Sequence, residues 1–302
     1  MVAFAQSHSD VLIFDRQLIK NQRERATNNF SDHNFLFDWA ENNLLERLND
    51  VNRTFSKALQ IGSRSSKAKK HQKIESLITL DITNAPVQSC SNFVQGSEEF
   101  LPIATKSMDL VISNLNLHSV NDLPGALAQI QNTLKEDGLF MASMLGGETL
   151  YELRKIMMET ELRLYGGTSP HIFPFADKPQ MGELLQRADF ALPVIDSEII
   201  TVTYDNAFKL FQDLRGMGEG NSIIERNKSP LGKSFFMDVA QEYQNQFTDD
   251  EGRIHATFEI IFLLGWAPHS SQQQPLRPGS AQHSLAEALE TTEMKTGDKA
   301  TP

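Results

Sequence analysis

The sequence contains a single cysteine, no long hydrophobic run and a shortage of basic residues. Cys90 is the only cysteine among 302 residues, which excludes an internal disulfide and a zinc site built from several cysteines. The longest apolar run, IIFLLGW at 260–266, is far shorter than the roughly 20 residues that cross a bilayer, so we expect no membrane span. Lys and Arg total 28 against 39 Asp and Glu, and the formal charge of −11 disfavours nucleic acid as a partner.

The N-terminal residues MVAFAQSHSDVLIF lack the positive segment and the long apolar core of a secretory signal. Together with the lone cysteine, this favours a reducing compartment, and we expect a cytoplasmic location. The hydrophobic content of 40% and the charged content of 22% are typical of a soluble globular protein. The length suits one large domain, or one domain with an elaborated lid.

A strand–helix–strand pattern stands in the middle of the chain. Met108–Ile112 is a short apolar run of strand length. Asp122 is a plausible helix N-cap, Pro124 lies in the first turn, and apolar residues at helical spacing continue until Gly138 stops the helix. The apolar run LFMASML at 139–145 follows at once. The pattern predicts two parallel strands joined by a crossover helix.

The loop after the first of these strands is rich in polar residues, among them Asn114 and His118. In parallel sheets ligands bind beyond the carboxyl ends of the strands. A histidine there, His118, is a candidate general base, or it packs on the following helix. Asn114 either orients a substrate or hydrogen-bonds to the adjacent loop. We take both residues as catalytic candidates.

A second unit of the same kind precedes them. The strand KALQIG at 57–62 ends in Gly62, and 19 residues later Asp81 terminates the strand at 77–80. In nucleoside-binding folds, a carboxylate at about this spacing binds the ribose hydroxyls, although strands often end in Asp for structural reasons. The lysine-rich segment at 63–76 is expected to form the connecting helix, with its lysines either solvated or holding an anion.

The remaining elements suggest how the chain is divided. Helices are predicted within 11–50, and Gly216, Gly218 and Gly220 are interpreted as caps and a flexible turn after a helix at 207–214. The predicted segments are N-terminal helices at 1–50, a βαβ core at 51–147, a helical lid with an additional strand at 148–250, a closing strand at 251–270 and a disordered tail at 271–302.

Several segments of the sequence resemble those of a known family. They are EEFLP at 98–102, MDLVISNLNLHSVNDLP at 108–124, SPHIFPFAD at 169–177 and DLRGMGEGN at 213–221. The chain resembles the class I S-adenosylmethionine (SAM) dependent methyltransferases over about 13–285. Within them it is similar to the bacterial and mitochondrial methyltransferase-like proteins that assemble respiratory complex I. The biotin-pathway malonyl-carrier-protein methyltransferases are cousins of that branch.

The resemblance implies a fold and a function. The fold is α/β, a three-layer Rossmann-like arrangement with a mostly parallel seven-stranded sheet, an antiparallel last strand and a helical lid. The implied function is modification of a protein side chain, in a complex I subunit or another protein substrate, with SAM as cofactor. Arginine hydroxylation, a catalytically silent assembly role and malonyl-carrier methylation remain alternatives, and the oligomeric state stays open.

The cofactor motif of the family is only partly present. After its first strand the family has an acid followed by three alternating glycines. Here Gln60 stands at the place of the acid, Gly62 matches, and Arg64 and Ser66 stand at the places of glycines. Losing a charge-assisted contact to a ligand cation costs on the order of 1–3 kcal/mol. The resemblance therefore implies a weakened SAM motif.

The other cofactor contacts are carried over in the same way. Asp81 matches the ribose acid, and Ser97 or Glu98 stands near the place of the acid that binds the adenine amino group, with Asn114 at the edge of the site. We expect Gln60, Gly62 and these four residues to contact the cofactor. No spacing of His, Asp or Glu indicates a metal site.

Overall fold

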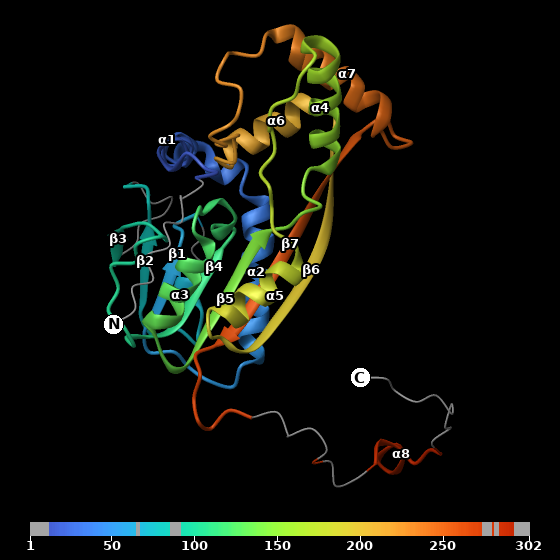
Figure 1. Ribbon diagram of the computed structural model, residues 1–302. Helices are drawn as coiled ribbons and strands as arrows, with labels where there is room; N and C mark the ends of the chain where they lie inside the picture. Colours follow the sequence, from blue (N-terminus) through green and yellow to red (C-terminus); the bar gives the residue numbers. More distant parts are fainter. Residues whose placement is uncertain (1–11, 65–66, 85–91, 274–279, 281–283, 293–302) are drawn as a thin grey trace, which may run out of the picture. The chain divides into compact units, whose positions relative to one another are not determined.

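The computed structural model describes residues 12–64, 67–84, 92–273, 280 and 284–292 (Figure 1). Ser66 and Cys90, discussed above, lie outside the described residues. The chain forms two units, 1–268 and 269–302. The described part of the second unit includes one short helix, α8 (Leu285–Ala288), and the proposed disordered tail stays a prediction.

The first unit is built on one sheet. Its strands in the described residues are β1 (Ala58–Ile61), β2 (Leu77–Asp81), β3 (Phe93–Gln95), β4 (Met108–Asn114), β5 (Leu134–Leu145), β6 (Ala191–Tyr204) and β7 (Ile254–Trp266). Their order across the sheet is β3-β2-β1-β4-β5-β7-β6. The pairs from β3 to β5 are parallel, and β7 runs antiparallel to both neighbours. This confirms the mostly parallel seven-stranded sheet with an antiparallel last strand.

Helices cover both faces of the sheet and one end of it. They are α1 (Arg16–Ala26), α2 (Phe35–Asp50), α3 (Leu123–Thr133), α4 (Tyr151–Tyr165), α5 (Lys178–Arg187), α6 (Ala207–Gly216) and α7 (Lys233–Gln246). In Figure 1, α3 and α5 lie in front of the strands and α2 lies behind them, while α4, α6 and α7 gather at the upper ends of β6 and β7. In this part of the chain, no helix is long and apolar enough to cross a membrane.

Alternation along the strands divides the apolar residues between two cores. In β1, Ala58 joins the core on the α2 side, whereas its neighbour Leu59 joins the core under α3 and α5. Both side chains are fully buried. Because successive strand residues point to opposite faces, a strand whose residues are all apolar must be covered on both sides. The three-layer arrangement follows.

The crossover helix α3 begins as predicted and ends earlier. The carboxylate of Asp122 accepts a hydrogen bond from the N–H of Gly125 at 2.9 Å, which confirms the N-cap. The helix stops at Thr133 because Leu134 already pairs with Met108 in the sheet. Strand β5 therefore begins several residues before Gly138.

The helix predicted after β1 is absent from the described part of that segment. Lys67–Lys70 forms a single 3₁₀ turn instead, with Ala68 as its buried residue. One apolar side chain cannot supply the stripe by which a helix packs on a sheet. Lys73 instead binds the end of helix α2. Its ammonium donates to the carbonyl oxygen of Asn49 at 2.7 Å, and a cation is favourable at a helix C-terminus.

Candidate functional site

The strand order reverses between β1 and β4. From β1 the chain moves outward through β2 and β3, and from β4 it moves in the opposite direction through β5. In open parallel sheets, ligands bind outside the carboxyl ends of the strands at such a reversal. The candidate site is therefore the crevice between residues 62–64, after β1, and residues 115–119, after β4. We call it the switch-point crevice.

Gly62 and Asn116 meet at the floor of this crevice. Gly62 has a φ of +93°, a conformation that glycine adopts without strain. A Cβ atom built on Gly62 would lie 3.0 Å from Oδ1 of Asn116, and Asn116 is fully buried. The asparagine side chain thus fills the space directly over the glycine, where a ligand would otherwise approach the backbone.

Arg64, in the loop after β1, reaches across the crevice. Its guanidinium donates to the carbonyl oxygens of Leu115 at 2.7 Å and Met217 at 3.1 Å. It also forms an ion pair with Glu219 at 2.5 Å. The guanidinium carbon lies 4.3 Å from the centre of the Phe37 ring, a cation–π contact. One buried arginine therefore joins both sides of the crevice and the turn after α6.

Helix α1 sends two more arginines into the crevice. Arg23 donates to Oδ1 of Asn116 at 2.8 Å and to the hydroxyl of Ser119 at 3.2 Å. It also lies 3.7 Å from one carboxylate oxygen of Glu98, a residue that is 1% exposed. Arg16 pairs with the other oxygen of Glu98, and the amide of Asn116 donates to the same carboxylate. Glu98 is thus fully engaged inside the protein.

Asp81 ends β2 and holds the loop after β1. Its carboxylate accepts hydrogen bonds from the N–H of Ser63 at 2.7 Å, the hydroxyl of Ser63 at 2.9 Å and the N–H of Thr83 at 2.8 Å. Burial raises the pKa of Asp81, but the charge of Arg23 and these donors outweigh burial, and the net shift is downward. The carboxylate is therefore ionised and already bound by backbone and hydroxyl groups.

The side chains of Gln60 and Ser97 also form local hydrogen bonds. The amide of Gln60 donates to the carbonyl oxygen of Gly62 at 3.0 Å. The hydroxyl of Ser97 accepts from the N–H of Glu99 at 3.2 Å, within a turn. Both interactions stabilise the loops in which these residues lie, and their cofactor roles stay predictions.

Asn114 supports the loop after β4. Its amide donates to the carbonyl oxygen of Phe37 at 2.9 Å, and its Oδ1 accepts from the hydroxyl of Ser143 at 2.7 Å. The first bond ties the start of α2 to the sheet, and the second ties β4 to β5. A positioning role agrees with this geometry, and the catalytic role stays a prediction.

His118 and Glu219 form a buried pair at the edge of the crevice. Nε2 of His118 lies 3.1 Å from Oε2 of Glu219, and the imidazole meets the ring of Phe175 edge-on at 5.8 Å. Burial lowers the pKa of His118, whereas burial raises that of Glu219 but is outweighed by Arg64 and His118, which lower it. The pair is thus a neutral imidazole donating through Nε2 to a carboxylate. Nδ1 is buried without a hydrogen-bond partner among the described residues.

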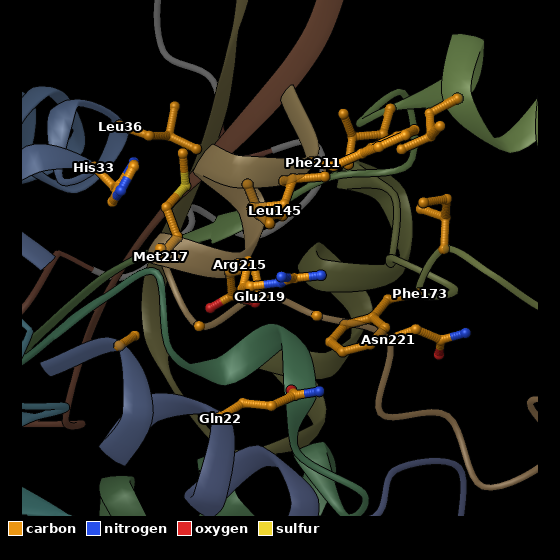
Figure 2. Close-up of a pocket in the computed structure, with 18 of the residues that line it drawn as sticks. Gln22, His33, Leu36, Leu145, Phe173, Phe211, Arg215, Met217, Glu219 and Asn221 are labelled. Carbon is orange, nitrogen blue, oxygen red and sulfur yellow. The ribbon is translucent and has the colours of Figure 1, made fainter. Parts of the chain in front are cut away.

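A cavity of about 620 Å³ adjoins the crevice and shares Leu115 and His118 with it, and it is also lined by Glu219, the partner of His118 and Arg64. Among the described residues that line it, apolar side chains predominate, including Leu145, Leu153, Met157, Phe173, Phe211 and Phe236. Figure 2 shows Gln22, from α1, across the cavity from Leu145 and Phe211. Because α4, α6 and the loop at 170–175 cover it, we call this space the lid cavity.

Three glycines bring the end of α6 and the turn after it against His33 and α1. A Cβ on Gly216 would lie 2.0 Å from the ring of His33, and a Cβ on Gly218, where φ is +76°, would lie 3.2 Å from Cα of Arg23. Gly220 packs in the same way against α1. Close approach accounts for Gly216 and Gly220. Gly218, with a positive φ and its N–H bonded to the carbonyl oxygen of Arg215, also ends α6 as the predicted cap.

Sequence reasoning missed three residues that organise the site, Arg23, Asn116 and Glu219. A signal existed for the first, because Arg16 and Arg23 are seven residues apart and so lie on one face of a helix. Glu219 stands within the glycine turn, where its partners come from distant segments. Within the described ranges, no group of three or more His, Cys, Asp or Glu side chains is arranged to hold a metal ion.

Comparisons with known proteins first define a class. Residues 59–142 match the model of the methyltransferase domain. The solved structure of the YcgJ protein of Bacillus subtilis has a TM-score of 0.51 at 15% identity, covering 76% of this chain and 100% of that one. Fold and domain match together confirm the Rossmann-like class I methyltransferase fold.

Full-length relatives then define the family. The Danio rerio protein named arginine-hydroxylase NDUFAF5, mitochondrial, is 36% identical over 292 residues, 93% of this chain and 91% of that protein. The malonyl-(acyl-carrier protein) O-methyltransferase of Xylella fastidiosa (strain M23) is 29% identical, covering 85% of this chain and 90% of that one. The chain belongs to the NDUFAF5 arginine-hydroxylase family, as the resemblance predicted.

The prediction of a cytoplasmic location is wrong. The Danio rerio relative, which matches nearly the whole chain, is named as a mitochondrial protein. The prediction rested on a lone cysteine and on an N-terminus without a secretory signal, and neither feature distinguishes the cytoplasm from the reducing interior of an organelle.

The domain match supports SAM as the cofactor of this class. The crevice residues of this chain, however, do not fit SAM in the observed arrangement. Asn116 lies over Gly62, the guanidinium of Arg64 spans the crevice, and Gln60 replaces the acid that would bind the ligand's ammonium. The carboxylates of Asp81 and Glu98 are bound by the protein's own donors.

Proposed function

We propose that this chain acts in the assembly of respiratory complex I, where it binds a partner subunit and modifies one of its side chains. The family supports the role, and the name of its vertebrate member supports arginine as the modified side chain. The observation that carries the proposal is the lid cavity, an apolar and aromatic space at the carboxyl edge of the sheet. Its volume of about 620 Å³ exceeds that of an amino-acid side chain.

The cavity offers suitable chemistry for a long side chain with a planar head. Phe173, Phe211 and Phe236 supply ring faces and edges, on which a guanidinium or an aliphatic stem packs. We infer that Nδ1 of His118, an acceptor in the neutral tautomer, receives an N–H from the bound group. Asn114 is then a positioning residue that keeps the loop of His118 on the sheet.

The cofactor requirement is part of the same proposal. We infer that the SAM motif is weakened in this chain, because Gln60 and Arg64 replace an acid and a glycine. A catalytically silent assembly protein is therefore the second candidate, and the filled switch-point crevice favours it. The two candidates share the partner and differ in whether the partner acquires a new group.

Adjacent methionines of α4 provide the test. Met157 lines the lid cavity and is 8% exposed, whereas Met158 points outward and is 49% exposed. In cells lacking the protein, we expect complex I assembly on native gels to be restored by the wild type and by Met158→Trp. Met157→Trp, which places a larger side chain in the cavity, should fail while remaining folded.

Mass spectrometry of the complex I subunits separates the candidates. An arginine that gains an oxygen atom or a methyl group only when the protein is present supports an enzyme. Restored assembly without any such change supports the silent assembly protein. Normal complex I in the deletion strain, together with a biotin requirement, would contradict both and favour malonyl-carrier methylation.

A further inference from the structure

We propose that the protein's own arginines, Arg64 and Arg23, occupy the crevice in which this fold holds SAM, so that the chain neither binds nor uses that cofactor. The inference comes from the contacts in the crevice and does not rest on the proposed role in complex I assembly. It replaces a weakened cofactor site with a site closed by the protein's own side chains.

The first step is the position of the two side chains. The strand reversal between β1 and β4 defines where a ligand would lie, over Gly62 and beside residues 115–119. Arg64 and Arg23 both end there: the former bonds to the carbonyl oxygen of Leu115, and the latter bonds to the amide oxygen of Asn116 over Gly62. Arg23 is 3% exposed and Arg64 is 6% exposed. Little solvent-filled space remains over the glycine.

The second step is charge. Three guanidinium groups, those of Arg16, Arg23 and Arg64, pair with or lie near three carboxylates, the buried ones of Asp81 and Glu98 and the largely buried one of Glu219. SAM would add a sulfonium and an ammonium, with one carboxylate. In a region of low dielectric constant an extra cation is costly unless a carboxylate is available for it. Every carboxylate in the crevice already has an arginine as neighbour.

The third step is mechanical closure. Arg64 bonds to the carbonyl oxygen of Met217 and to Glu219, which belong to the glycine turn after α6. That turn packs against α1 at Gly218, beside Arg23. The two arginines thus join α1, the glycine turn and the sheet edge. A ligand could enter the crevice only if this whole contact opened.

The first measurement is calorimetric titration of the full chain with SAM. We expect no saturable binding by the wild type at millimolar SAM. In the double variant Gln60→Glu/Arg64→Gly, which restores the acid and the glycine of the family motif, we expect an affinity at least tenfold higher. Arg64→Lys, which keeps the positive charge, should behave like the wild type. Saturable micromolar binding by the wild type would overturn the proposal, and so would a folded double variant without any gain.

The second measurement needs no variant. A dicarbonyl reagent that modifies arginine should react with Arg25 and Arg215, which are exposed at the rim of the lid cavity. It should leave Arg23 and Arg64 unmodified in peptide mass spectra, and added SAM should change neither pattern. Modification of Arg64 at the rate of Arg25 would overturn the proposal. Neither result bears on complex I assembly, so this proposal and the proposed function can fail separately.

Discussion

The switch-point crevice and the lid cavity lie side by side and share residues of the loop after β4, yet they are lined by different kinds of side chain. The crevice contains buried arginines and carboxylates bonded to one another. The cavity is walled mainly by leucine, methionine and phenylalanine side chains and keeps about 620 Å³ of space. The comparison shows that side chains can pack tightly at the strand reversal between β1 and β4 while a cavity remains nearby, at the end of β5.

The difference also separates what each region does for the protein. A buried charge is costly once its partner is removed, so we expect substitutions of the charged residues in the crevice to destabilise the fold. Apolar side chains have no partner charge to lose, and one can be replaced by another of similar volume at a modest cost in stability. We therefore expect substitutions in the crevice to act on folding and substitutions in the cavity to act on binding.

The largest effect should come from Glu98→Gln. The change removes the counter-charge of the buried Arg23 guanidinium and of the partly buried Arg16 guanidinium. We expect the free energy of unfolding in urea to fall by about 3 kcal/mol or more. Glu136→Gln breaks an exposed pair with Lys106 and should cost less than about 1 kcal/mol. Equal costs would mean that the crevice network does not stabilise the fold.

A smaller effect should come from Gly218→Ala, which tests the closure of the crevice by the glycine turn. Gly218 and Gly166 have similar φ values, +76° and +73°, so alanine costs about 1–2 kcal/mol at either position. A Cβ at Gly166 meets open space, whereas one at Gly218 approaches Cα of Arg23 within 3.2 Å. We expect Gly218→Ala to be the more destabilising and to speed hydrogen exchange in α1. Matching results for both variants would contradict the close contact.

The smallest effect concerns pH and His118, which belongs to both regions. In the folded protein the pKa of His118 is lowered from its ordinary value of 6.5, so the unfolded chain binds the proton more readily. The stability that this difference provides is complete above about pH 6.5 and is lost as the pH falls toward the folded pKa. We expect a decrease in Tm of about 2–4 °C for each 1 kcal/mol lost.

The variant His118→Asn tests whether this loss of stability comes from His118. His118→Asn should flatten the Tm profile between pH 7 and about pH 5. Both proteins should lose further stability below about pH 4, because Asp81 and Glu219 have pKa values lowered by their arginine neighbours. A variant whose profile parallels the wild type throughout would show that His118 is not the titrating group.

Most of the fold followed from local patterns. The apolar runs, the N-cap at Asp122 and the spacing of the parallel units predicted the sheet and its crossover helix, because these signals lie within a few residues of the element that they define. The helix expected after β1 was wrong for a related reason. Its segment has helical length but only Ala68 and Ile74 as buried apolar residues, and length alone does not provide a face that packs.

For the candidate site, the sequence predicted the position in the fold but not the contacts between its side chains. The strand ends indicated Gly62, Asp81 and the loop of His118, which the structure places at one edge of the sheet, while their roles stay predictions. The partners of those residues could not be predicted from the sequence, because Arg23 and Glu219 are almost 200 positions apart in the chain. Charge pairing across such separations leaves no periodic signal. Arg64 was recognised as a departure from the family motif, but its bond to Leu115 required the structure.

The pairing of Arg64 with Glu219 has a consequence for the order in which the protein is made. The two residues are 155 positions apart, and the contact also requires α1, which is synthesised much earlier. While the ribosome is still translating, the emerging chain carries Arg16, Arg23 and Arg64 with one of their acidic partners missing. Domains generally fold as units, and here Arg64 has no Glu219 to pair with until the glycine turn has been synthesised. Strand β7, which pairs with both β5 and β6, is synthesised later still, so the first unit can be completed only near the end of its translation.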